Sequence, residues 1–98
     1  MKRGYKDVGE ADLAKEVLQE VFRYDRHTGL FHWRHDQSQR KKAGDVAGTR
    51  SSKGIRLEVE GVTYYAHRVA FLFIYGRWPI VVLHKNGDKL DNRECNIS

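Results

Sequence analysis

The chain has 98 residues, which is enough for one domain with a modest hydrophobic core and too few for two domains. Its 40% hydrophobic and 32% charged residues are typical of a folded domain and exclude a disordered chain. A single cysteine, Cys95, excludes an internal disulfide and a zinc site of paired cysteines. No apolar run is long enough for a signal peptide or a membrane span, so we expect a cytoplasmic protein without a membrane partner.

The N-terminal part of the chain is predicted to form an arm and a helix. Residues 1–9 are polar and are expected to be a mobile arm. Apolar residues then return at helical spacing, with charged residues between them, which predicts an amphipathic helix from Leu13 to Phe22. The apolar positions are Leu13, Val17, Leu18, Val21 and Phe22. This helix is expected to cover one side of the core.

A turn over residues 24–29 is followed by a predicted strand from Leu30 to Arg34. Phe31 and Trp33 are expected to face the core, with His32 and Arg34 on the other side. Residues 35–50 then read as a polar loop.

Positive charge is concentrated in the middle third of the chain. Residues 23–56 contain nine Lys and Arg against three Asp, a difference of +6, which exceeds the net charge of +5 for the whole chain. A solvated loop is one explanation, but this concentration favours contact with nucleic-acid phosphates. The candidate binding residues are Arg34, Arg40, Lys41, Lys42, Arg50, Lys53 and Arg56.

Strict alternation of apolar and polar residues predicts a β-hairpin over residues 55–66, with its turn at Glu60 and Gly61. Such a ribbon fits the major groove of DNA, although a purely structural hairpin would show the same pattern. The next segment, from His67 to Tyr75, is apolar on nearly every side and predicts a buried helix that Gly76 and Pro79 terminate. The change of period predicts an α+β fold, a small antiparallel sheet with two packing helices.

The last part of the chain carries the candidate chemistry. An apolar run ends at His84, a turn follows at residues 86–88, and Asn92 and Asn96 come next. A histidine held at such an edge can accept a proton, although it could equally serve only to cap a loop.

The segment resembles the HNH endonuclease motif of phage and mobile-intron proteins. Earlier pieces of the resemblance occur in the expected order: Tyr24-Asp25, Thr28-Gly29, Trp33-Arg34, Ala66-His67-Arg68 and Trp78-Pro79. The resemblance implies one HNH-like domain over residues 1–98, in which residues 81–98 form a partial ββα-metal hairpin. It also implies that His84 is the general base and Asn96 positions it, with His67 as an orienting, hydrogen-bonded histidine.

The family uses one divalent cation, so the resemblance implies Mg²⁺ or Mn²⁺ as the cofactor of this chain, and no zinc is expected. Leu83 occupies the position of a metal-binding aspartate, and the last ligand of the family would lie after Ser98. Asp88 and Asp91 are the candidate replacements, so the cation is expected to be weakly held.

Three functions remain open. The first is a DNA endonuclease whose metal site is completed by residues outside this chain or by a partner subunit. The second is an inactive descendant that binds double-stranded DNA. The third is an inhibitor that binds a protein partner through the edge of the hairpin. The oligomeric state and the DNA sequence preference do not follow from the sequence.

Overall fold

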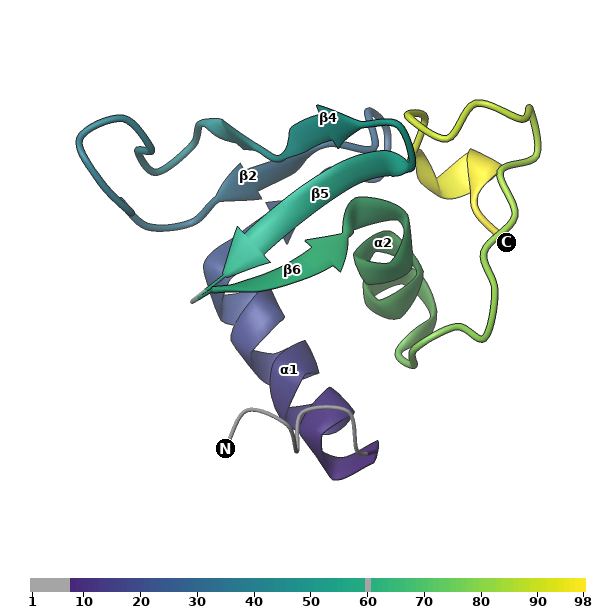
Figure 1. Ribbon diagram of the computed structural model, residues 1–98, viewed down its shortest axis with the longest axis horizontal. Coiled ribbons are helices and arrows are strands. Elements are labelled where there is room, and N and C mark those ends of the chain that lie inside the picture. Colours follow the sequence, from purple (N-terminus) through teal and green to yellow (C-terminus); the bar gives the residue numbers. More distant parts are fainter. Residues whose placement is uncertain (1–7, 60) are drawn as a thin grey trace.

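The computed structural model describes residues 8–59 and 61–98, with side chains from residue 15 onward. Two helices and two three-stranded antiparallel sheets make up the described part of the chain, so the predicted α+β class is confirmed, with two small sheets where we expected one (Figure 1). The elements are α1 (Val8–Val21), β1 (Phe22–Tyr24), β2 (Phe31–Trp33), β3 (Val46–Ala47), β4 (Thr49–Ser51), β5 (Gly54–Val59), β6 (Val62–Tyr65), α2 (Ala66–Tyr75) and the short 3-10 helix η2 (Glu94–Asn96).

Helix α1 differs from the predicted helix at both ends. It begins at Val8, so the last two residues of the predicted arm are helical, and residues 1–7 of that arm lie outside the described residues. Phe22 starts β1 instead of ending the helix. The centroid of its ring lies 4.8 Å from that of Trp33, its partner in the sheet. Aromatic residues are enriched in strands, which agrees with this placement. Val17, predicted to face the core, is 43% exposed.

The first sheet has the strand order β1-β2-β3. Phe31 and Trp33 are buried on one side of β2, as predicted, and His32 lies on the other side. Strand β3 falls within the predicted loop of residues 35–50. Only two residues pair there, Val46 and Ala47, and a strand this short has no recognisable alternation in the sequence.

The second sheet has the order β4-β5-β6, and its β5–β6 hairpin is the predicted one. Leu57 is buried toward the core, whereas Arg56 and Glu58 are exposed on the opposite face. Strand β4 pairs along the other edge of β5, with Thr49 opposite Arg56.

Helix α2 packs against β5 and β6. Its buried residues are Ala66, Val69, Ala70, Phe71 and Leu72. Gly76 ends the helix as predicted: its left-handed backbone (φ 80°) directs its N–H to the carbonyl oxygen of Leu72. Burial is less complete than predicted, because Tyr75 is 49% exposed.

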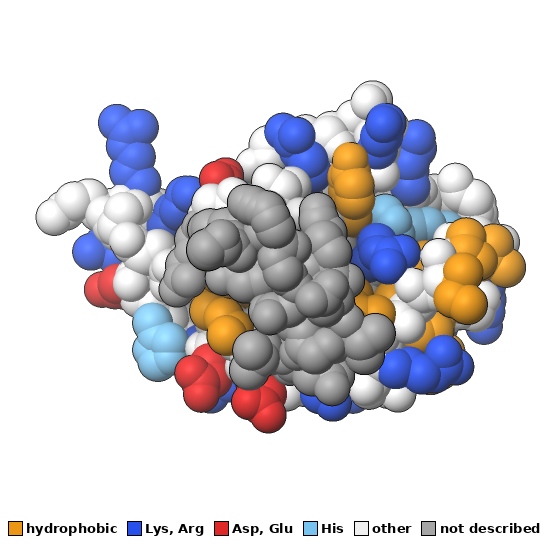
Figure 2. Space-filling model, turned by 60° about the horizontal axis from the view of Figure 1, so that its bottom comes forward, with side chains coloured by type: hydrophobic (Ala, Val, Ile, Leu, Met, Phe, Trp, Pro, Cys, Tyr) orange, Lys and Arg blue, Asp and Glu red, His pale blue; other side chains and the backbone are white. Residues whose placement is uncertain are grey.

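The segment between α2 and the C-terminal loop is irregular and carries exposed apolar side chains. Ile80 is 97% exposed, and Val81 and Leu83 are more than half exposed. Figure 2 shows hydrophobic side chains gathered on the right, the side on which this segment lies in Figure 1. None of the described helices is both long and apolar enough to cross a membrane.

Candidate active site

The candidate site is a loop of residues 84–97, the histidine loop, whose two ends pair with each other. Leu83 and Ser98 exchange two backbone hydrogen bonds of 2.8 and 3.1 Å, and His84 and Ile97 form an antiparallel bridge. The amide of Lys85 donates to the carbonyl oxygen of Asn96 at 2.9 Å. His84 is therefore fixed at the first residue of a closed loop.

Asn96 organises the interior of the histidine loop. Its side chain is buried, and its amide nitrogen donates to the Asn86 side-chain oxygen at 2.9 Å and to the Asp91 carbonyl oxygen at 2.8 Å. Its amide oxygen accepts from the backbone N–H of Asn86 at 3.0 Å. Because one side chain satisfies three groups on both limbs of the loop, Asn96 fixes the loop's shape.

The imidazole of His84 is oriented by Asn92. Nε2 of His84 lies 2.9 Å from Oδ1 of Asn92, and Asn92 is only 1% exposed. In this orientation the amide oxygen can only accept, so a hydrogen bond between the two side chains requires the Nε2–H tautomer of the neutral ring. The lone pair on Nδ1 is then the one available to take a proton.

The hairpin of β1 and β2 supports Asn92 from the other end of the sequence. The Tyr24 hydroxyl donates to the backbone carbonyl oxygen of Asn92 at 2.5 Å, and burial raises the pKa of that hydroxyl. Gly29, at φ 77°, lies so close that a Cβ there would overlap the backbone of Asn92 and Arg93. Sequence reasoning missed this support. The motif pairs Tyr24-Asp25 and Asp91-Asn92 were the available signal, but spacing could not show that they touch.

His67 lies beside His84, with the two ring centroids 5.4 Å apart and the rings at 69°. On its other side His67 stacks against Tyr65, at a centroid distance of 5.6 Å. Its Nδ1 is buried and has no hydrogen-bond partner within the described part of the chain, so the predicted hydrogen bond is wrong for that nitrogen. Burial, with the neighbouring charges of His84 and Arg68, lowers the pKa of His67 and favours its neutral form.

The carboxylates of the histidine loop are engaged in holding it together. Both oxygens of Asp91 accept from the Arg93 guanidinium, at 2.8 and 2.7 Å, and one also accepts from the Asn86 amide. These bonds hold the pKa of Asp91 well below its usual range. Asp88 is exposed and accepts the N–H of Leu90 at 2.9 Å. Across residues 15–59 and 61–98, no three His, Cys, Asp or Glu side chains gather into a group that could hold a metal ion.

The donor set therefore does not fit the divalent cation that the motif implies. Such a cation needs several free oxygen ligands, and Asp91 offers none without losing its bonds to Arg93. Leu83, directly before His84, has an apolar side chain that is 62% exposed.

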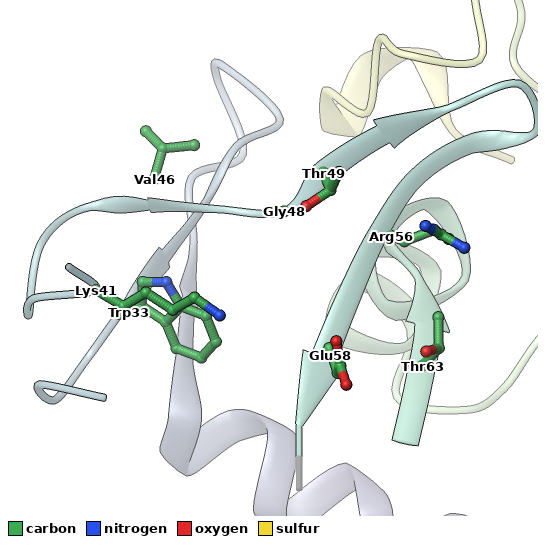
Figure 3. Close-up of a pocket in the computed structure, with 8 residues that line it drawn as sticks. All are labelled: Trp33, Lys41, Val46, Gly48, Thr49, Arg56, Glu58 and Thr63. Atoms are coloured by element: carbon green, nitrogen blue, oxygen red, sulfur yellow. The ribbon is translucent and has the colours of Figure 1, made fainter. Parts of the chain in front are cut away.

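Two of the predicted DNA-binding residues, Lys41 and Arg56, line one groove of about 340 Å³ between the two sheets (Figure 3). The nitrogen of Lys41 lies 5.9 Å from the centre of the Trp33 ring, within the range of a cation–π contact. The other lining residues are Val46, Gly48, Thr49, Glu58 and Thr63.

Arg50 and Arg34 lie elsewhere. Arg50 lines a second cavity of about 250 Å³, together with Ile55 and Asn92. The guanidinium of Arg34 donates to the carbonyl oxygen of Gln19 at 2.6 Å, which ties it to α1. Neither side chain lines the groove that contains Arg56.

The remaining predicted residues lie on exposed loops. Lys42 forms a 3.9 Å ion pair with Asp36, and both side chains are more than half exposed, so the pair contributes little stability. Arg40 and Lys53 are exposed. The structure thus brings two of the seven predicted residues together and distributes the others around the molecule.

Residues 64–97 match the family described as HNH endonuclease. The match covers 34 of the 98 residues and spans the second half of β6, the whole of α2 and the histidine loop through Ile97. No curated protein and no solved structure matches the chain. The match confirms the resemblance that the motifs indicated, and it indicates a nuclease-like function at the level of the family.

Proposed function

We propose that this chain, whose residues 64–97 are of the HNH endonuclease type, binds double-stranded DNA and presents His84 to a phosphodiester bond as a general base. The observation that carries the proposal is the 2.9 Å bond between His84 Nε2 and Asn92 Oδ1. It fixes the ring and leaves Nδ1 with a free lone pair. A histidine that served only to cap the loop would need no such buried orienting partner.

In the proposed reaction, Nδ1 of His84 takes a proton from a water molecule as its oxygen attacks the phosphorus. The bond between the phosphorus and the leaving sugar oxygen breaks, and that oxygen takes up a proton from solvent. General-base catalysis of this kind contributes about 10²- to 10⁴-fold to a rate. Negative charge also develops on phosphate oxygens that the base does not touch. A divalent cation supplies that stabilisation in the family, but the histidine loop has too few free oxygen donors to hold one.

The shortage of free oxygen donors in the histidine loop favours a second candidate function, DNA binding without efficient cleavage. Leu83 contributes no ligand, and both oxygens of Asp91 are bonded to Arg93. Efficient cleavage would require that residues outside the described chain, or a partner subunit, complete the metal site. Without them, we expect binding to be retained and cleavage to be slow or undetectable.

The experiment that tests the function has a binding arm and a cleavage arm. Affinity for a DNA duplex is measured against salt concentration, and supercoiled plasmid is incubated with the protein and Mg²⁺ or Mn²⁺. His84→Ala is compared with His35→Ala, which removes an exposed histidine outside the loop. We expect all three proteins to bind DNA with a strong salt dependence, and any slow nicking to disappear only in His84→Ala.

Two results would decide against parts of this proposal. Absence of salt-dependent DNA binding by the wild-type protein would reject the function. Brisk nicking that His84→Ala abolishes would support the base and reject the candidate without cleavage. The orientation of the base has its own readout, because ¹⁵N NMR should show the Nε2–H form of His84 in the wild type and its loss in Asn92→Ala.

A further inference from the structure

The outer face of the second sheet carries a row of polar side chains. Since side chains alternate along a strand, Arg56 and Glu58 point away from the core that Leu57 enters. Residues directly opposite in the sheet share a face, so Thr49 and Tyr65 lie on either side of Arg56. The row therefore crosses all three strands, β4, β5 and β6.

This row leads to the histidines. Tyr65 stacks on His67, and the ring of His67 meets that of His84. At the end of β5 the same face reaches His67 directly, because a Cβ at Gly54 would lie 3.5 Å from its Nδ1. The outer face of the sheet and the site of His84 are therefore neighbours.

A hydrogen bond fastens the histidine loop to the sheet. The Lys89 ammonium donates to the carbonyl oxygen of Ser52, in the β4–β5 turn, at 2.6 Å. Figure 1 shows this turn beside the C-terminal loop. The polar row and the candidate base therefore lie on adjoining parts of the molecule, which this bond joins.

The charge on this surface suits a phosphate backbone. Arg56 is exposed, and it forms no ion pair within residues 15–59 and 61–98. Figure 3 shows Lys41 with Trp33 on one side of the groove and Arg56 on β5 across from them. Glu58 is the one carboxylate among the residues lining the groove. It follows Arg56 by two residues on β5 and is therefore farther from Gly54, at the start of the strand.

We propose that one DNA strand runs along the outer face of β4–β5–β6, from the groove between Lys41 and Arg56 to His84, and that Arg56 contacts a backbone phosphate. This path rests on the proposed DNA-binding function. A strand rises about 3.3 Å per residue, so Arg56 lies about 7 Å along β5 from Gly54. Arg56 therefore reaches a different phosphate of the same strand from the one at His84.

The sheet provides a matched control for Arg56. Arg50 lies on the adjacent strand β4, where it pairs with Ile55, and lines the second cavity instead of the groove. Both side chains are exposed, and Arg56→Gln and Arg50→Gln each remove one positive charge. Any effect of net charge alone is therefore the same in the two variants.

The experiment measures duplex affinity of the full chain by fluorescence anisotropy at several salt concentrations. Losing one phosphate contact should reduce the slope of log K against log salt by about 0.9 and weaken binding about five- to tenfold near 0.1 M salt. We expect this for Arg56→Gln and less than a twofold change for Arg50→Gln. Circular dichroism of both variants confirms that they are folded.

A second variant tests how far the strand follows the face. Glu58→Gln removes the carboxylate beside the path, so it should tighten binding two- to threefold. Equal weakening by Arg56→Gln and Arg50→Gln, or greater weakening by Arg50→Gln, would overturn the path while leaving DNA binding intact. Failure of the wild-type protein to bind DNA would instead overturn the proposed function, and the path with it.

Discussion

The aromatic core and the histidine loop are stabilised by different kinds of interaction. Phe22, Phe31 and Trp33 pack ring against ring and are buried. The histidine loop buries few apolar side chains, Ile97 being one, and keeps its shape through the directional hydrogen bonds of Asn96. Burial of apolar area is non-directional, whereas a hydrogen-bonded loop depends on single atoms. The site can therefore lose its geometry while the fold survives, but it cannot survive loss of the core.

The largest expected effect is in the core. Phe22→Ala removes a ring that is 1% exposed and that contacts both Phe31 and Trp33. We expect the free energy of unfolding to fall by about 3–5 kcal/mol, and DNA binding to be lost at temperatures where the variant unfolds. Urea unfolding measures the loss. A cost below about 1 kcal/mol would show that this ring is not central to the core.

The next effect separates the loop from the core. Asn96→Ala removes three hydrogen bonds and leaves the N–H of Asn86 without its acceptor. We expect a cost of about 2–3 kcal/mol, with NMR shifts concentrated in residues 84–97 and the aromatic core unchanged. Gln37→Ala, at an exposed amide, is the control. Shifts that spread equally through β2 and α2 would contradict the separation.

Substitutions at two glycines test how closely the hairpin of β1 and β2 packs against the histidine loop. Gly29 and Gly61 have similar backbone angles, φ 77° and 80°, but a Cβ at Gly61 would meet nothing within 4 Å. Gly61→Ala should cost about 1 kcal/mol from backbone strain alone. Gly29→Ala should cost about 2 kcal/mol or more, because it also displaces the backbone at Asn92. Equal midpoints of thermal unfolding for the two variants would show that this contact has room to relax.

The smallest expected effect is a dependence on acid. Hydrogen bonds from Arg93, and then from Asn86, lower the pKa of Asp91 below its ordinary value near 3.8. Its stabilising contribution is therefore complete above about pH 4 and is lost as the pH falls through the folded-state value. Asp91→Asn should be slightly less stable at pH 7 and should lose less stability on further acidification. Parallel stability curves for the two proteins between pH 6 and pH 2 would contradict this assignment.

The pattern of apolar and polar residues was sufficient to predict the elements that it covers from end to end. Strand β5 alternates between buried Leu57 and exposed neighbours, and α2 is a continuous apolar run, so both were predicted. Strands β3 and β4 have two and three residues, too few to show a period, and unlike the equally short β2 they contain no aromatic residue. Phe22 continues the helical spacing of α1, and only its pairing with Trp33 reveals that the helix has ended.

The resemblance to the HNH motif suggested His84 and Asn96 as site residues, and the structure places both in one loop whose ends pair with each other. The resemblance could not select Tyr24 as the support of Asn92, since the two residues are 68 positions apart. The cluster of positive charge was visible in the sequence, but strand pairing decides the face that each side chain occupies. Arg56 and Arg50 therefore lie on different surfaces.

The bond between Tyr24 and Asn92 also has a consequence for the order of folding. Contacts between residues 68 positions apart form late, because the entropy of closing so long a segment must first be overcome. In a refolding experiment, the tryptophan signal of the core should recover before the NMR signature of ordered His84. A chain that has folded only partly would then lack an oriented His84, so the geometry of the histidine loop would be complete only in fully folded molecules.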